Sequence, residues 1–524
     1  PHHMEITIAI ASNSNYLTDI VVRNPEFLYQ IFNPEYLTQE LSLDKLNDKI
    51  QIGLSNYKTY EAKLNYLRLF KRRIILSIGV NDILKKSNIL ETTLNLSILA
   101  NSIISSLFQI CYEEVKSKHK LPSLNAQFCL VSLGKLGGNE LNYSSDIDLM
   151  VFYENDPEVS RETSNEFYDL LNNTILLFIK SSTVISDKGY IYRVDFRLRP
   201  DGSKSPLCRT FTDLTAYYET RGEEWERQML IKLNYVSGSR ILYKKFTSFL
   251  KKHVYESRLN SSPLDKIKQM KKNIELYNRS EENIKFSKGG IRDIEFSVQA
   301  LQLINGNKFE ILQNSNTLAT ISCLGHNNLL SVDEAETLTE AYVFYRKIEH
   351  FMQLMNDTQT HKIPSDEILL NKLAIYQNQK NISTLNIQVS QYRKDVQKIY
   401  SSVFNADKGN ENQKGEFDSI KFADRKRAEK NLNYLRTGKG LLEQKQFDTR
   451  TIKNFDRIAN NLIHYLNTSE APDLTLENLV KVTQGFSLPS IIYREFEDKN
   501  FLNSFLKICN FSQIAIDSLS IIPL

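Results

Sequence analysis

The chain has few of the residues that mark stapled or membrane-bound proteins. Its five cysteines in 524 residues are odd in number, far apart and never in CxxC spacing, which argues against a disulfide framework and a structural zinc site. No uninterrupted apolar run approaches the roughly 18 residues that span a bilayer. Lys and Arg number 66 against 62 Asp and Glu, so net charge does not indicate a nucleic-acid or membrane binder. We expect a cytoplasmic protein without membrane or nucleic-acid partners.

Glycine is also scarce, with 18 in the whole chain, yet three occur in the stretch "GKLGGNELNYSSDID" (134–148). The apolar run 126–133 before it and the run 146–154 after it predict strands, with a tight turn at "GKLGG" and one or two helical turns at "NELNYS". Gly137 and Gly138 would let the backbone approach a ligand closely, and a helix start would add a positive dipole end. Such a turn suits a phosphate.

The rest of the chain is mainly helical in its periodicity. We expect helices in 4–120, a mixed block of strands and helices in 121–250, a helical domain in 251–408, and a linker and C-terminal helical region in 409–524. The stretch 405–419 is the best linker candidate because it has almost nothing to bury. Residues 1–3 resemble a cloning remnant, so the native chain is expected to start at Met4.

Two alternating patterns place carboxylates on strands. Asp146 and Asp148 are two apart, so they share one face of a strand while Ile147 faces the core. The later run "YIYRVDFRLRP" (190–200) predicts a third strand that carries Asp195 among arginines. If this strand pairs beside 146–152, three carboxylates could hold two divalent cations about 4 Å apart, which suits phosphoryl or nucleotidyl transfer.

These blocks resemble a known family. The order strand, glycine turn, "SSDID" and a later strand with one Asp is that of the polymerase-β-like nucleotidyltransferases. The blocks "SLGKLGGNELNYSSDIDLMVFY", "YRVDFRLRPDGSKSPL", "YYETRGEEWERQMLIK", "FSKGGIRDIEFSVQALQLI" and "YRKIEHFMQLMNDTQTHKIP" resemble, more closely, the bifunctional glutamine synthetase adenylyltransferase/adenylyl-removing enzymes. The resemblance implies an α+β fold, with a polymerase-β-like domain of a small mixed sheet and helices embedded in a mainly helical chain.

The resemblance is closest to the N-terminal, adenylyl-removing half of that family. It implies phosphorolysis of adenylyl-tyrosine on glutamine synthetase, with phosphate as co-substrate, ADP as product and nitrogen assimilation as the process controlled. The PII signal protein is an expected partner of the full-length enzyme. The last segment resembles the opening of the family's second half, so we expect a chain cut near that junction or a naturally short protein.

The same resemblance implies site residues. Asp146, Asp148 and Asp195 would be the catalytic and metal-binding carboxylates, with Mg²⁺, in two copies, as the cofactor. The phosphate and nucleotide site would use Lys135, Gly137, Gly138, Ser144, Ser145, Arg193, Arg197, Arg199 and Arg292. Trp225 is expected to be a buried anchor between domains rather than a base-stacking residue, and Arg346, Glu349 and His350 to be structural.

Three alternatives stay open. The chain could run the opposite reaction, adenylylation with ATP, because a phenol with a pKa near 10 makes the transfer reversible. It could be an RNA-directed nucleotidyltransferase that uses the basic stretch 251–272, although acidic residues interrupt that stretch. It could also be a regulatory module that binds glutamine synthetase or PII without turnover.

Overall fold

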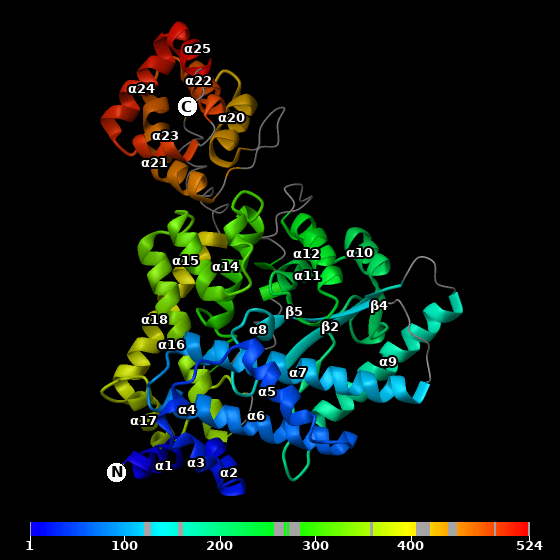
Figure 1. The fold of residues 1–524 in the computed structure, drawn as a ribbon. Helices are drawn as coiled ribbons and strands as arrows, with labels where there is room; N and C mark the ends of the chain where they lie inside the picture. The colour runs from blue at the N-terminus through cyan, green and yellow to red at the C-terminus, as the bar shows by residue number, and fades with distance from the viewer. Residues whose placement is uncertain are drawn as a thin grey trace. The chain divides into compact units, whose positions relative to one another are not determined.

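The computed structural model describes residues 2–119, 127–155, 161–255, 267–268, 270–271, 283–356, 360–404, 420–438, 447, 449–486 and 489–521. These residues are mostly helical with one small mixed sheet (Figure 1), which agrees with the expected α+β class. The predicted linker 405–419 and most of the basic stretch 251–272 lie outside the described residues.

The chain divides into two compact units. The large unit comprises 1–323 and 336–396, and the C-terminal unit comprises 324–335 and 397–524. The sheet lies in the large unit, between 127 and 238. The predicted boundaries at 120, 250 and 408 stay predictions.

Helices open the large unit. Their starts follow the usual capping rule, since the hydroxyls of Ser14, Ser42 and Thr59 accept a backbone N–H from the first turn of α2, α5 and α6. The bounds are α1 His2–Asn13, α2 Asn15–Arg23, α3 Phe27–Ile31, α4 Pro34–Leu37, α5 Leu43–Leu54, α6 Tyr60–Ile83 and α7 Ile89–His119. By length and composition alone α7 could cross a membrane, but 67% of its apolar window is buried inside the protein.

The sheet has the strand order β3-β2-β1-β5, and β4 also pairs with β2. β1 is antiparallel to β2 and β5, whereas β3 and β4 run parallel to β2. The register places Asp148 opposite Asp195, which confirms the predicted pairing of the third strand with the second. The strands are β1 Gln127–Ser132, β2 Ile147–Glu154, β3 Val194–Asp195, β4 Cys208–Thr210 and β5 Asn234–Gly238.

Helices cover both faces of the sheet. Val151 of β2 belongs to the core built by α6, α7 and α9 (Arg161–Thr183). Its neighbour Phe152 points the other way and meets Phe246 of α12 with ring centroids 4.8 Å apart. Because both faces are buried, the strand reads as a nearly continuous apolar run rather than an alternation. The other helices of this block are α8 Gly134–Gly137, α10 Phe211–Thr220, α11 Glu224–Leu230 and α12 Arg240–Val254.

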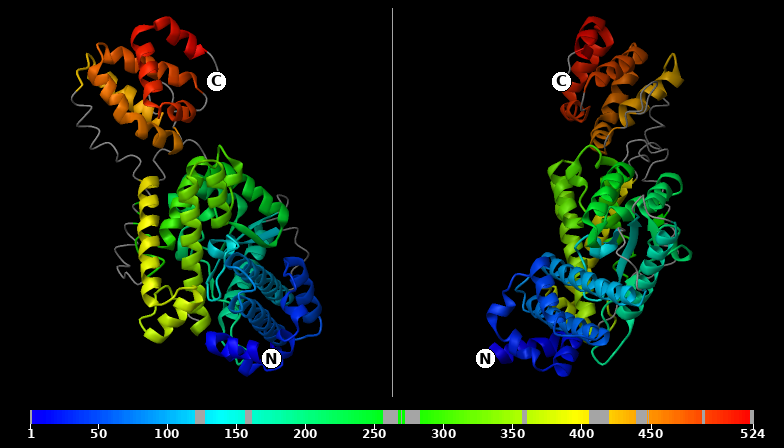
Figure 2. Two further views of the ribbon diagram at one scale, coloured as in Figure 1. Left: turned by 90° about the vertical axis from the view of Figure 1, so that its left-hand side faces the viewer. Right: turned by 45° about the vertical axis from the view of Figure 1, so that its right-hand side comes forward.

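The remaining helices of the chain follow the sheet. α14, α15, α16, α17 and α18 span Ile291–Asn305, Thr317–His326, Val332–Asn356, Glu367–Tyr376 and Ile382–Phe404. The C-terminal unit has its own apolar core, which includes Phe455 and Leu462. Figure 2 shows its helices α20 Arg425–Thr437, α21 Thr449–Thr468, α22 Pro472–Gly485, α23 Pro489–Glu495, α24 Lys499–Phe511 and α25 Gln513–Ile521.

Two local predictions were wrong. The run 190–200 is a strand only at Val194–Asp195, because Arg199 turns back and donates to the carbonyl oxygens of Phe196, Ser203, Ser205 and Pro206. The helical turn of the glycine motif lies at 134–137 instead of 139–144. Residues 140–146 are not helical, since their polar groups bond to distant elements described below.

Candidate active site

A cavity of about 450 Å³ opens at the start of β2 in the large unit. Asp146, Asp148 and Asp195 line one part of it, and Lys135, Lys232, Lys285 and Arg292 line another. Of the other predicted site residues, Ser145 and Arg197 also line the cavity, whereas Gly137, Gly138, Ser144, Arg193 and Arg199 are not among its lining residues. The sequence motifs from 134–148, 190–200 and 288–296 therefore meet in one place.

The three aspartates sit in unequal environments. Burial raises the pKa of Asp148, and together with the nearby carboxylates of Asp195 and Asp146 it brings that pKa to about 7. Burial also acts on Asp195, but hydrogen bonds from Arg197 outweigh it and lower the pKa of that carboxyl. The backbone N–H of Arg197 donates to Asp195 Oδ1 at 2.7 Å, and its Nε donates to Oδ2 at 2.8 Å. Asp148 is thus the carboxylate that most needs a positive partner.

Arginine also holds Asp146. The Nε of Arg193 donates to Asp146 Oδ1 at 2.7 Å, and its Nη2 donates to the carbonyl oxygen of Ser144. Arg193 therefore fixes the backbone just before β2 from the side of β3. Arg199 is only 7% exposed and donates hydrogen bonds to backbone carbonyl oxygens. We therefore assign it a structural role in the segment after β3 rather than a role in the cavity.

The glycines of the motif have different tasks. Gly134 has φ +55°, and a Cβ there would lie 2.4 Å from Asp148 Oδ2, so only glycine leaves room for that carboxylate. A Cβ on Gly137 would lie 1.7 Å from the carbonyl oxygen of Lys232. Gly137 thus permits close packing of the turn on the chain before β5. The glycine that leaves space beside an aspartate is Gly134, the first glycine of "GKLGG".

Arg292 faces the cavity without a carboxylate partner. No Asp or Glu oxygen among the described residues lies within 4 Å of its guanidinium, and its buried Nε has no hydrogen-bond partner. The guanidinium stacks near Phe286 and Phe296, at 5.3 and 5.2 Å from the ring centroids. The residue is therefore held in place as a cation with hydrogen-bonding capacity left for an anion.

Three lysines share this part of the cavity. Burial lowers the pKa of Lys135 to about 8 and also lowers that of Lys285. Lys232 pairs with Glu140 and lies 3.7 Å from Glu295, and these carboxylates raise its pKa against the effect of burial. Lys285 had not been predicted; its only sequence signal is its place a few residues before "GGIRD".

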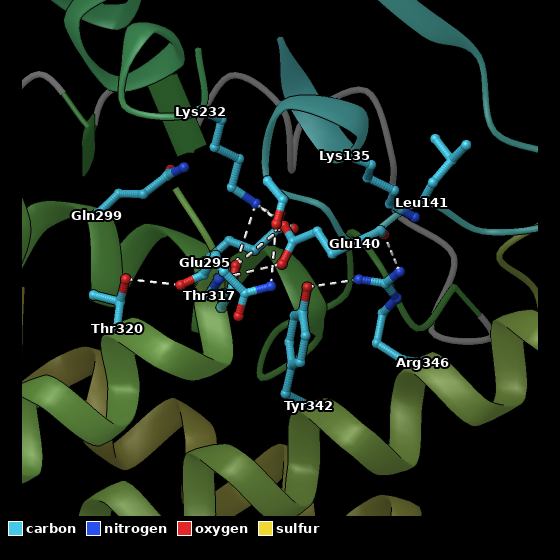
Figure 3. Close-up of polar contacts among 12 residues, drawn as sticks. Lys135, Glu140, Leu141, Lys232, Glu295, Gln299, Thr317, Thr320, Tyr342 and Arg346 are labelled. Carbon is cyan, nitrogen blue, oxygen red and sulfur yellow. Dashed lines mark hydrogen bonds and ion pairs between the residues drawn. The ribbon is translucent and has the colours of Figure 1, made fainter. Parts of the chain in front are cut away.

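A buried polar network joins the glycine motif to α16 and to the helices around it. Glu140 accepts from Lys232 and from Thr317, while Arg346 donates to the carbonyl oxygen of Glu140 (Figure 3). One oxygen of Glu349 accepts from Lys135 Nζ at 3.0 Å. The segment 140–145 is held by these side chains instead of by helical hydrogen bonds. Arg346 and Glu349 were expected to be structural residues. Their contacts hold the glycine motif of the candidate site in place.

Further contacts complete this network. Asn142 Nδ2 donates to Glu349 Oε2 at 2.7 Å, and Asn142 Oδ1 accepts from Arg346 Nε and lies 3.1 Å from His350 Nε2. The backbone N–H of Ser144 donates to Gln353 Oε1 at 2.8 Å. Asn142 and Ser144, which lie shortly before the aspartate pair, are thereby bonded to side chains of α16.

The prediction for Trp225 was wrong. Its side chain is 40% exposed and lines the cavity rather than anchoring a domain. Trp225 lies on the short helix α11, which also contributes Gln228 and Met229 to the lining of the cavity. A flat exposed ring at the mouth of a charged cavity can stack on a nucleobase.

The donor set fits a hard divalent cation. Asp148 and Asp195 of two paired strands, and Asp146 directly before β2, line the cavity, and Mg²⁺ prefers oxygen ligands. No group of three or more His, Cys, Asp or Glu side chains in the described part of the chain is already arranged to hold a metal. Arg193 forms an ion pair with Asp146, and Arg197 forms one with Asp195. To bind the ion, Asp146 would have to release Arg193 and Asp195 would have to release Arg197.

Two family models match successive parts of the chain. Residues 4–249 match the family model described as Glutamate-ammonia ligase adenylyltransferase. Residues 264–404 match the model described as GlnD PII-uridylyltransferase. A bifunctional glutamine synthetase adenylyltransferase/adenylyl-removing enzyme of Hahella chejuensis (strain KCTC 2396) is 31% identical over 401 residues, which cover 74% of this chain and 41% of that relative. The chain spans less than half the length of that relative.

Proposed function

Because residues 4–249 belong to the glutamate-ammonia ligase adenylyltransferase family, we propose that this chain is a nucleotidyltransferase that removes AMP from an adenylylated tyrosine of glutamine synthetase by phosphorolysis. The observation that carries the proposal is the cavity in which three aspartates, two on β2 and β3 and one directly before β2, lie together with Arg292 and three lysines. Such a cavity suits two anions and a divalent cation at once. The domain would have the polymerase-β-like fold.

In the proposed reaction, an oxygen of inorganic phosphate attacks the phosphorus of the adenylyl-tyrosine. A bond forms between phosphate and that phosphorus, the bond to the tyrosyl oxygen breaks, and the phenol takes a proton, leaving ADP and unmodified tyrosine. Phosphate is already a nucleophile, so a strong general base is not required. The chain must instead hold two anions together and balance the charge on the leaving oxygen.

The residues divide this work. Arg292, Lys285 and Lys135 would bind the attacking phosphate, since Arg292 keeps free hydrogen-bonding capacity. Asp146, Asp148 and Asp195 would hold Mg²⁺, in two copies, which when bound neutralises charge on the transferring group. Trp225 would stack on the adenine at the rim. Arg197 would release Asp195 to the cation and turn to a phosphate oxygen.

The partners follow from the same family. Glutamine synthetase would be the protein substrate, as the name of the Hahella relative states for that protein. The PII signal protein would act on the full-length enzyme, and the match of 264–404 to a PII-uridylyltransferase model supports this. A cytoplasmic location fits because no disulfide joins the cysteines of the described chain.

The test is a phosphorolysis assay with ADP detection. Adenylylated glutamine synthetase, phosphate and Mg²⁺ should yield ADP with the wild-type chain, and Asp195→Asn should lower the rate by about a hundredfold or more. Asp213→Asn is the matched control, because Asp213 is exposed and pairs with Arg209 outside the cavity. Absence of ADP, with AMP transferred from ATP to unmodified glutamine synthetase instead, would assign the opposite direction.

A further inference from the structure

One wall of the active-site cavity, formed by α11 and α14 within the large unit, is uncharged. The residues of this uncharged wall are Trp225, Gln228 and Met229 from α11 and Phe296 and Gln299 from α14. Charged side chains make up most of the remaining lining of the cavity. The reaction proposed above uses the charged part and assigns the uncharged wall only the stacking of a base on Trp225.

Two buried glutamines join the helices at this wall. Gln228 is 4% exposed and Gln299 is 9% exposed, and Gln228 Nε2 donates to Gln299 Oε1 at 2.6 Å. This bond uses one polar atom of each amide. Among the described residues, neither Gln228 Oε1 nor Gln299 Nε2 has a hydrogen-bond partner. A buried polar atom without a partner is costly, so an acceptor and a donor left over in a cavity wall indicate a ligand that bonds to them.

The contacts between the two segments show that they run antiparallel. Gln228 meets Gln299 through the amide bond. Lys232, four positions after Gln228, lies 3.7 Å from Glu295, four positions before Gln299 (Figure 3). Positions four apart share one face of a helix, so each segment presents one row of side chains to the other and to the cavity.

These rows have a cationic end and an aromatic end. Arg292 lies seven residues before Gln299 on α14, which is about 10 Å of helix, and Lys232 lies toward the same end. Trp225 precedes Gln228 by about one turn of α11, so it lies at the opposite end. A nucleotide has the same polarity, with phosphate at one end and a flat base at the other. The uncharged wall therefore lies where the base of a bound nucleotide would be.

We propose that the Gln228–Gln299 amide pair determines the specificity of the site for adenine. Gln228 Oε1 accepts from the exocyclic amine of the base, and Gln299 Nε2 donates to the ring nitrogen beside it. A 6-oxopurine presents an acceptor and an N–H at these two places, so both of its contacts would be mismatched. This inference rests on the function proposed above, because it concerns the base of the AMP group that is transferred.

Base selectivity in equilibrium binding tests this directly. ADP and inosine diphosphate are titrated separately into the full chain by calorimetry, with Mg²⁺ and without glutamine synthetase. The two nucleotides differ only in the edge of the base, so the wild type should bind ADP about 10- to 100-fold more tightly. Equal affinities, or tighter binding of inosine diphosphate, would overturn the proposal. Absence of binding by both nucleotides at roughly 1 mM would overturn it as well.

Methionine variants locate the recognition. Gln228→Met and Gln299→Met should each lower the preference for ADP by about tenfold. The affinity for inorganic pyrophosphate, which has no base, should stay unchanged. If a single variant folds poorly because it leaves the other amide without its partner, the double variant serves, since replacing both partners by apolar groups of similar shape is nearly neutral. A wild-type preference in the double variant would overturn the assignment.

Gln302→Met is the matched control. Gln302 is also buried on α14, but its Nε2 donates to the carbonyl oxygens of Leu312 and Asn314, and it does not line the cavity. This variant should melt at a lower temperature and keep the preference for ADP. A loss of preference equal to that in Gln299→Met would show that the preference follows packing rather than base recognition, and would overturn the proposal.

A last variant separates stacking from recognition. Trp225→Ala should weaken the binding of ADP and of inosine diphosphate equally, by about tenfold or more, because stacking does not distinguish one base from another. A loss of the preference itself in this variant would assign recognition to the indole instead of the amides.

The binding data also separate this inference from the proposed reaction. Release of ADP in the phosphorolysis assay without a preference for ADP in the wild type would refute base recognition by the glutamines and leave the reaction intact. A preference for ADP that the methionine variants lose, without phosphorolysis, would refute the reaction and support the adenine site.

Discussion

Replacing Glu349 with glutamine should destabilise the large unit and loosen the turn before the aspartates. Its carboxylate is fully buried and meets Lys135 Nζ at 3.0 Å, Asn142 Nδ2 at 2.7 Å, His361 Nδ1 at 2.6 Å and Arg346 Nε at 3.3 Å. An amide has one acceptor oxygen and no charge. Removing one partner of a buried ion pair costs about 3–5 kcal/mol, because the remaining charges stay desolvated. We expect about 3 kcal/mol, since glutamine keeps one acceptor.

The assay is urea unfolding followed by the fluorescence of Trp225, the only tryptophan, which lies in the large unit. Glu336→Gln on the same helix, α16, is the matched control; its side chain is exposed and the change should stay within about 0.5 kcal/mol. A midpoint shift in Glu349→Gln no larger than that of the control would refute the importance of the network.

The pH dependence gives a second check. Burial would raise the pKa of Glu349, but Lys135, His361 and Arg346 outweigh burial and hold it well below 4.5. A carboxyl whose pKa is lower in the folded state stabilises the fold above its unfolded pKa, near 4.5, and loses that contribution as the pH falls through the folded value. The stability gap between the wild type and Glu349→Gln should therefore be full at pH 7 and narrow below pH 4.5. A gap that stays constant to pH 3 would contradict this origin.

The other predictions concern single groups. Lys135→Arg should move the basic limb of the phosphate-dependent rate to higher pH, because burial holds the pKa of Lys135 to about 8; an unmoved limb would remove Lys135 from phosphate binding. Gly289→Ala should destabilise by clearly more than the ~1–2 kcal/mol of a left-handed alanine, because φ is +72° and a Cβ would lie 2.0 Å from the carbonyl oxygen of Arg393. Gly202→Ala, at φ +66° with its nearest contact at 4.0 Å, measures the backbone cost alone in the same unfolding assay. Arg197→Gln should tighten Mn²⁺ binding in a spin-resonance titration without phosphate, since it frees Asp195; an equal or weaker affinity would argue against Asp195 as a ligand.

Local patterns were enough to predict the acidic part of the site. A period of two placed Asp148 and Asp195 on strands, and the apolar runs around them indicated that the strands were buried. Strand pairing then brings the two residues into register. These inferences succeed because they rest on neighbours within a few positions along the chain.

The basic part of the site was only partly predictable. Arg292 was expected from the resemblance to the family, but Lys285 was missed because a lysine before a turn has the same local pattern as any solvated residue. Trp225 was expected to be a buried anchor between domains, whereas it lines the cavity. Neither position could be judged without knowing that α11 and the start of α14 line the same cavity.

The segment 139–144 after the glycines was predicted to be helical. The buried network explains why it is not. Lys135 and Glu349 are 214 positions apart, so no local pattern links them. On α16, Arg346 and Glu349 lie at buried positions, where a helix built only for packing would have apolar residues. The charges of Arg346 and Glu349 are buried because polar groups of 140–145 form hydrogen bonds with them. The segment 140–145 makes these bonds instead of the hydrogen bonds of a helix. The same exchange fixes the backbone from which Asp146 projects, so the positions where pattern-based prediction fails are those that hold the site together.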